Sequence, residues 1–88
     1  MIPAIMPSYG QPELAFERGE GLDLYTTDGR RFLDFGGGIA VTLLGHSHPH
    51  LVQALVGQAE KLWHTSNLYR IPQQERLADR LVANSFAD

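Results

Sequence analysis

The chain has 88 residues, of which 43% are hydrophobic and 19% are charged, and its formal net charge is −3. This composition is ordinary for one small globular domain and argues against a disordered chain. Seven Lys and Arg residues against ten Asp and Glu residues exclude a strongly basic surface for nucleic acid. The absence of cysteine excludes disulfides and thiolate metal sites.

The N-terminus shows no targeting signal. No basic segment precedes its apolar residues, and Pro3 and Pro7 interrupt them, which is unlike a signal peptide. The longest apolar run, residues 39–44, is too short to cross a membrane. We therefore expect a cytoplasmic protein that is not bound to a membrane.

The first half of the chain predicts a small antiparallel sheet. Residues 1–12 contain three prolines and a glycine, which predicts an irregular N-terminal arm. The weak alternation of residues 13–18 is compatible with a strand. Residues 22–27 and 31–35 flank an Asp-Gly pair, which favours a hairpin with a type I′ turn because both residues tolerate positive φ.

The second half predicts a loop and two helices. Glycines 36–38 end the hairpin, and residues 39–48 are expected to form a loop. Pro49 and Pro72 each suit the first position of a helix, because proline has a fixed φ. Apolar residues at helical spacing predict that the first helix extends to Trp63. The face of the second helix that we expect to be buried consists of Leu77, Ala78, Leu81 and Val82. The predicted fold class is α+β: an arm, a hairpin or small sheet, and two helices.

Three histidines alternate in the segment LLGHSHPH. In a strand, His46, His48 and His50 would project from one face, as ligands of a zinc ion do. Pro49 opposes a strand, and no carboxylate lies in the same stretch to orient an imidazole. We therefore favour a helix start over a metal site and expect His46 and His48 to hydrogen-bond to the backbone there.

Neither the glycines nor the lysine predicts a cofactor site. Glycines 36–38 do not match a phosphate-binding motif, and they permit either a backbone that lines a pocket or a plain sharp turn. Lys61 is the single lysine, and it lies on the polar face of a predicted helix rather than in a desolvated pocket. The pattern leaves open whether Asp23 and Asp34, on or beside the hairpin, face a site or solvent.

Four segments in fixed order resemble a known family, although no single segment would be specific. Together they resemble the N-terminal segment of the class III pyridoxal-phosphate-dependent aminotransferases, and within that family they are most similar to the acetylornithine aminotransferases. The matching segments are Gly21–Phe35 with its D-G-R-x-F-L-D-F end, Gly38–Val41 (G-I-A-V), Leu44–Pro49 (L-G-H-x-H-P) and His64–Tyr69 (H-T-S-N-L-Y).

The resemblance implies a fold-type I transferase that acts as a homodimer. Such an enzyme uses pyridoxal phosphate to transfer an amino group between N-acetylornithine and 2-oxoglutarate in arginine biosynthesis, and some members also act on succinyl-diaminopimelate. Residues 1–88 would form part of its small domain and the start of its large domain. The family's Schiff-base lysine and cofactor-binding groups would lie beyond residue 88. The resemblance therefore implies no catalytic, cofactor-binding or metal-binding residue here, no bound cofactor, and no activity of these residues alone.

The resemblance also suggests two substrate-binding residues. Two tyrosines that hold the substrate in ornithine aminotransferases match Asp23 and Ile39, so those contacts do not carry over. Ile39 remains a candidate wall of the substrate pocket, and Asn67 lies in a segment that matches the surroundings of the active site and the subunit interface. The alternative to an enzyme segment is a small self-associating binding module without enzymatic activity.

Overall fold

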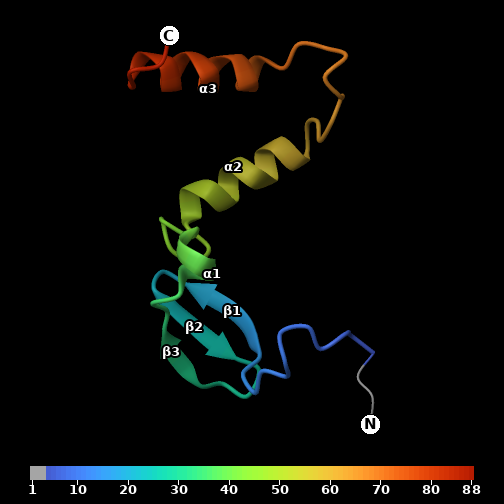
Figure 1. Ribbon diagram of the computed structural model, residues 1–88, viewed down its shortest axis with the longest axis vertical. Helices are drawn as coiled ribbons and strands as arrows, with labels where there is room; N and C mark the ends of the chain where they lie inside the picture. The colour runs from blue at the N-terminus through green and yellow to red at the C-terminus, as the bar shows by residue number, and fades with distance from the viewer. Residues whose placement is uncertain (1–3) are drawn as a thin grey trace. The chain divides into compact units, whose positions relative to one another are not determined.

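The computed structural model describes residues 4–88, which divide into two compact units, one that ends at Val56 and one that spans Gly57–Asp88. We describe each unit by itself. Figure 1 labels the elements in chain order. They are the strands β1 (Phe16–Glu20), β2 (Asp23–Thr26) and β3 (Arg31–Leu33), followed by α1 (Gly37–Ala40), α2 (Pro49–Ala59) and α3 (Pro72–Ala83). The α2 helix crosses the boundary between the two units.

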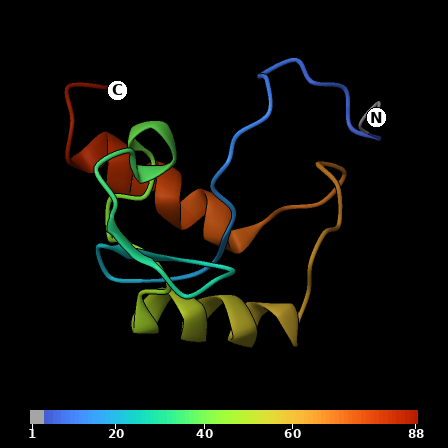
Figure 2. The same ribbon diagram turned by 90° about the horizontal axis from the view of Figure 1, so that it is seen from below.

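The first unit is built on a three-stranded antiparallel sheet with the order β1-β2-β3 (Figures 1 and 2). The predicted sheet is confirmed, although β1 begins three residues later than the segment 13–18 suggested. Phe16 and Phe32 meet edge to face across the sheet, with ring centroids 5.9 Å apart. The guanidinium of Arg18 lies over the ring of Tyr25 at 3.7 Å. Aromatic contacts thus supplement the ladder between strands.

The turn between β2 and β3 differs from the predicted type. Gly29 has a φ of 88°, but Asp28 is not among the residues with positive φ, so the turn is not type I′. The Thr26 hydroxyl explains the difference, because it donates to the Asp28 carboxylate and accepts the backbone N–H of Arg30 at 2.9 Å. Thr26 is 1% exposed and is the single buried residue among residues 4–88. Its side chain fixes the turn by local hydrogen bonds.

A short helical turn, α1, replaces part of the expected loop, and it is left-handed. The four residues Gly37, Gly38, Ile39 and Ala40 have φ values of 56°, 62°, 68° and 60°. The N–H of Ala40 donates to the carbonyl of Gly36, and that of Val41 to the carbonyl of Gly37. The glycines were expected to permit either a backbone that lines a pocket or a plain sharp turn. In the structure they permit a handedness that L-residues avoid.

The α2 helix begins at Pro49, as predicted, but ends at Ala59, before Trp63. Near this end, two side chains donate hydrogen bonds to backbone carbonyls. The amide of Gln58 donates to Leu62 at 2.7 Å, and the indole of Trp63 donates to Ala59 at 2.6 Å. Such bonds satisfy carbonyls that continued helix would otherwise use. The periodic apolar pattern therefore overestimated the length of the helix.

The α3 helix of the second unit also begins at its predicted proline, Pro72. Glu75 in its first turn pairs with Arg70 through two hydrogen bonds of 2.8 Å. The face that was expected to be buried is open in this chain: Leu77, Leu81 and Val82 are 59%, 61% and 45% exposed. Spacing identified the apolar face correctly, but nothing in the described residues covers it.

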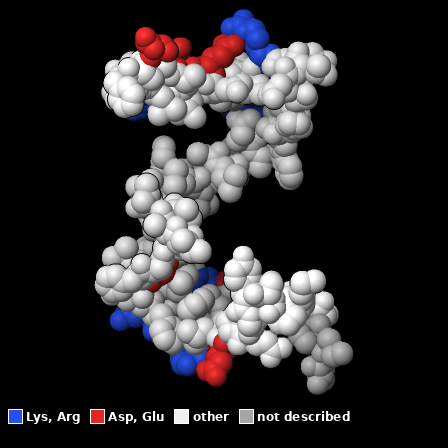
Figure 3. Space-filling view, in the orientation of Figure 1, with Lys and Arg blue, Asp and Glu red and all other residues white. Residues whose placement is uncertain are grey.

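No described helix has the length and apolarity needed to cross a membrane. In Figure 3, acidic and basic side chains are interspersed over the sheet on the face that is drawn. Over the sheet, that face therefore presents no patch of a single charge sign.

Candidate functional site

The candidate site is the loop of residues 36–45, whose two ends are held together. The loop leaves the sheet after β3, where the N–H of Asp34 donates to the carbonyl of Leu22 at 2.8 Å. It returns at His46, which forms a backbone bridge with Gly21. The two bonds of this bridge measure 3.0 and 2.8 Å. The left-handed turn α1 lies between these two anchor points.

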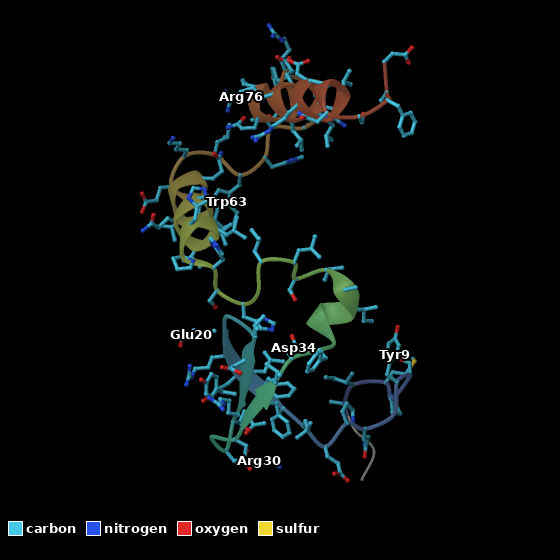
Figure 4. All side chains as sticks on the ribbon, turned by 90° about the vertical axis from the view of Figure 1, so that its left-hand side faces the viewer. Tyr9, Glu20, Arg30, Asp34, Trp63 and Arg76 are labelled. Carbon is cyan, nitrogen blue, oxygen red and sulfur yellow. The ribbon has the colours of Figure 1, made fainter. Side chains whose placement is uncertain are left out.

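One carboxylate, that of Asp34, contacts both ends of the loop. Its Oδ1 atom accepts the backbone N–H groups of Gly36 and Gly37, each at 2.9 Å. Its Oδ2 atom lies 2.6 Å from Nε2 of His46. Figure 4 labels Asp34 at the end of β3, beside the α1 turn. The side chains of Asp34 and His46 are only 11% and 20% exposed, so this contact is largely sheltered from water.

These hydrogen bonds favour the ionised form of Asp34. Its pKa lies below the usual value, first because the N–H of Gly37 donates to the carboxylate and then because His46 does. An ionised carboxylate only accepts hydrogen bonds. The short contact therefore assigns the proton on this side of the imidazole to Nε2 of His46.

Two glycines allow His46 to approach the sheet. A Cβ atom at Gly19 would lie 2.6 Å from both Cβ and Cγ of His46, so the imidazole packs against bare backbone of β1. A Cβ atom at Gly45 would lie 2.6 Å from the carbonyl oxygen of Gly21, and Gly45 has a φ of 77°. A side chain at Gly45 would meet backbone, which cannot rotate away.

The loop presents Ile39 to the outside. Its backbone has φ 68° and ψ 58°, a rare conformation for a β-branched residue, and its side chain is 92% exposed. Left-handed geometry costs roughly 1–2 kcal/mol per L-residue, so Ile39 and Ala40 together carry about 2–4 kcal/mol of strain. Strained residues cluster at functional sites. This strain distinguishes the turn from an ordinary connection.

His46 and His48 do not make the hydrogen bonds to the backbone that the sequence analysis expected. The expected bond from the His46 side chain to the backbone is wrong, because the imidazole binds the carboxylate of Asp34 instead. Nδ1 of His48 is buried and has no hydrogen-bond partner within residues 4–88, so no backbone bond is found there either. Both side chains line a hollow of about 430 Å³, together with Arg18, Glu20 and Leu44. In the described part of the chain, no three His, Cys, Asp or Glu side chains gather as metal ligands.

The second predicted substrate residue, Asn67, belongs to the other compact unit. It is exposed and follows Ser66, whose φ is 68°. The Ser66 hydroxyl accepts the backbone N–H of Leu68 at 3.4 Å, which closes a small turn around Asn67. Both predicted substrate residues are therefore exposed and lie in or beside left-handed backbone, each within its own unit.

The described residues do not fit a pyridoxal-phosphate site. Lys61 is exposed in the turn after α2, where no apolar pocket surrounds its ammonium group. The N–H groups of Gly36 and Gly37, which would be donors for a phosphate, are already bound to Asp34. No reaction step is therefore assigned to a cofactor held by these residues.

The sequence did not predict the contact between Asp34 and His46. No carboxylate lies next to the histidines in the sequence, and Asp34, twelve residues before His46, is brought there by the loop. A local signal was present, because an aspartate two residues before a glycine often accepts the following backbone N–H groups. That signal predicts the bonds to Gly36 and Gly37, but not the partner on the other oxygen.

Comparison with known proteins identifies the family of this chain. The sequence profile of the family "Aminotransferase class-III" matches residues 4–88. The acetylornithine aminotransferase of Rhodobacter capsulatus is 62% identical over 88 residues, which are 100% of this chain and 22% of that enzyme. The acetylornithine aminotransferase of Brucella melitensis is 62% identical over 81 residues, 92% of this chain and 20% of that enzyme.

A solved structure supports the same relationship. The crystal structure of N-acetylornithine aminotransferase from Stenotrophomonas maltophilia superimposes with a TM-score of 0.78 and 47% sequence identity. The match covers 85% of this chain and 21% of that chain. The chain thus spans about a fifth of the length of the relatives that it matches. Because the family profile matches nearly every residue, the chain belongs to the class III aminotransferase family.

Proposed function

We propose that this chain is the N-terminal part of an acetylornithine aminotransferase, which transfers an amino group between N-acetylornithine and 2-oxoglutarate in arginine biosynthesis. The observation that carries the proposal is the 62% identity to an acetylornithine aminotransferase along all 88 residues. The whole enzyme would be a cytoplasmic homodimer of fold-type I. These residues would supply part of its small domain and the start of its large domain.

Pyridoxal phosphate in the whole enzyme would supply the electron sink that amino-group transfer requires. The lysine and the other groups that hold it would come from outside these 88 residues, because Lys61 does not fit that role. The chain by itself would therefore bind no pyridoxal phosphate and have no transaminase activity. Its contribution would be to the shape of the site.

The contribution that the geometry supports best is a wall of the substrate pocket. The proposed wall is Ile39, since a strained turn holds this apolar side chain 92% exposed and away from the sheet. An apolar side chain suits the methylene stem of N-acetylornithine, and it would exclude water from it. Asn67 would add an amide that can donate to or accept from polar groups of the substrate.

A chimeric enzyme tests the proposed function. Residues 1–88 replace the matching 88 residues of the Rhodobacter capsulatus enzyme, and the purified holoenzyme is assayed with N-acetylornithine, ornithine and succinyl-diaminopimelate. We expect the chimera to transaminate N-acetylornithine with a kcat/KM within about tenfold of the parent, since a tenfold loss corresponds to about 1.4 kcal/mol. A folded, cofactor-loaded chimera that does not use N-acetylornithine contradicts the proposal.

Substitutions at Ile39 test the pocket wall in the same chimera. Ile39→Ala removes three side-chain carbons and should raise KM for N-acetylornithine by at least about tenfold, because each lost methylene or methyl contact is worth about 1–3 kcal/mol. Ile39→Val removes only one of these carbons and keeps the β-branch, so its KM should lie between those of the parent and the Ile39→Ala protein. Equal KM values for the three proteins would show that Ile39 does not contact the substrate.

A further inference from the structure

The central turn of the 36–45 loop is strained, and its side chains are not packed against the rest of the unit. Ile39 is 92% exposed, so burial of its side chain does not stabilise the turn in this chain. Gly37 and Gly38 lose more conformational entropy than other residues when they are ordered. Besides the backbone bonds from Ala40 to Gly36 and from Val41 to Gly37, contacts at the ends of the loop must therefore help to hold the turn.

The contacts at the loop's ends provide this hold. Asp34 accepts the N–H groups of Gly36 and Gly37 and thereby fixes the direction in which the turn begins. The same carboxylate binds Nε2 of His46, where the loop returns to the sheet. The backbone bridge between His46 and Gly21 sets the position of that imidazole.

The side chains of Asp34 and His46 lie outside the hydrogen-bonded ladders of the sheet. The strands are joined by the ladders of β1 with β2 and of β2 with β3, and neither ladder involves these two side chains. Both oxygens of Asp34 are directed to the loop and its return point. The geometry therefore assigns these two side chains to holding the loop rather than to joining the strands.

We propose that Asp34 and His46 form a positioning pair, which keeps the left-handed turn folded before substrate arrives and so presents Ile39 in its substrate-binding position. The inference rests on the proposed function, because it names residues that act on the substrate through Ile39. A preformed wall lowers the ordering cost of binding.

The test is a double-mutant cycle in the chimeric holoenzyme described above. Asp34→Ala removes the acceptor for both glycine N–H groups, and His46→Leu removes the imidazole donor while keeping an apolar side chain of similar reach. Each should raise KM for N-acetylornithine about tenfold while changing kcat less, because lost positioning of a binding wall weakens substrate binding. His46→Gln can still donate an amide N–H to Asp34 and should retain nearly the parent KM.

The second arm of the cycle introduces Asp34→Ala into the Ile39→Gly background. If the pair acts through the Ile39 side chain, Asp34→Ala should then change KM by less than about twofold, because coupled residues are not additive. An equally large rise in KM in both backgrounds overturns the inference. A lower melting temperature with an unchanged KM overturns it as well, because it shows a structural role alone.

Two further outcomes are distinguishable. If Asp34→Ala yields no folded holoenzyme, Asp34→Asn and His46→Leu are compared in the same two backgrounds and decide the question by the same criteria. An unsubstituted chimera without activity on N-acetylornithine overturns the proposed function and the inference with it. An active chimera whose pair variants keep the parent KM overturns the inference alone.

Discussion

Oδ2 of Asp34 lies 2.6 Å from Nε2 of His46, and this contact joins the end of β3 to the residue at which the 36–45 loop returns to the sheet. Because Oδ1 of the same aspartate holds Gly36 and Gly37, one side chain determines where the loop begins and where it ends. The left-handed turn that carries Ile39 is thereby enclosed between two fixed points.

The first prediction concerns the close approach at Gly45. Gly45→Ala should destabilise the folded enzyme more than Gly29→Ala does. Both residues have positive φ, so both substitutions incur left-handed strain of roughly 1–2 kcal/mol. Only at Gly45 would the new Cβ also lie 2.6 Å from the Gly21 carbonyl oxygen, whereas Gly29 has open space around it. Urea unfolding of the two variants measures the difference.

The comparison with Gly29 isolates the steric contribution. If both variants unfold at the same urea concentration, the bridge between Gly21 and His46 does not need a glycine at position 45. A structure of the Gly45→Ala variant should show that bridge lengthened or lost. The Asp34 contact to His46 should then be disturbed as well, since the imidazole follows its backbone.

The second prediction concerns the stability of the folded enzyme at acidic pH. The folded pKa of Asp34 is lowered, so its ionised form is favoured in the folded state and stabilises that state at all pH values above the unfolded pKa. The pKa of an aspartate in an unfolded chain is about 3.9. The stabilisation from Asp34 should therefore be constant from neutral pH down to about pH 4 and should be lost below that, as pH falls through the lowered folded value.

The Asp34→Asn variant reveals this pH dependence when its unfolding free energy is subtracted from that of the parent. The unfolding free energy of the parent minus that of the variant should be flat above about pH 4 and should shrink below it. Asp28→Asn provides a comparison, because the pKa of Asp28 is also lowered, first by the Thr26 hydroxyl and then by Arg30. A difference that does not shrink as the pH falls below about 4 would contradict the assignment to a carboxylate.

Local signals predicted much of the fold. The Asp-Gly pair predicted the hairpin, and the two prolines marked where α2 and α3 begin, because each of these residues restricts or permits backbone angles without help from distant parts of the chain. The turn type was wrong because it depends on a side chain, that of Thr26, and not on the pair alone.

The candidate site was predictable only in part. Glycines 36–38 permit many conformations, so their presence does not select a left-handed turn; the contacts of Asp34 and the i to i−4 bonds of Ala40 and Val41 make that selection. The partnership of Asp34 with His46 depends on how the loop closes, which no local pattern encodes. Resemblance suggested Ile39 as a pocket wall, which stays a prediction, and the strained backbone of this residue was not foreseen.

The third prediction concerns the start of α3. Two hydrogen bonds from Arg70 lower the pKa of the Glu75 carboxyl. Arg70→Ala should therefore raise the pKa of Glu75 toward the ordinary glutamate value, which is observable by carbon-13 NMR titration of the carboxyl group. Arg76→Ala is the matched control, because neighbours at i and i+1 do not face each other on a helix. An unchanged pKa in the Arg70→Ala protein would show that the pair does not persist in solution.

The fourth prediction concerns residues 1–88 when they are expressed alone. Within residues 4–88 only Thr26 is buried, and apolar side chains such as Leu55, Trp63 and Leu68 are 71–85% exposed. Exposed apolar surface of this extent favours association and loose packing. We therefore expect the isolated chain to bind a hydrophobic dye, to elute as an oligomer in size-exclusion chromatography with light scattering, and to melt without a sharp transition.

Substitutions on one apolar face show whether that face drives the association. Leu77→Gln with Leu81→Gln removes two exposed leucines from α3 and should lower the apparent mass. Arg76→Gln with Arg80→Gln changes two charged positions of the same helix and serves as the matched control. A monomer that melts sharply and binds no dye would contradict the expectation. It would instead favour a self-sufficient module over a segment that needs the remainder of an aminotransferase to cover its apolar faces.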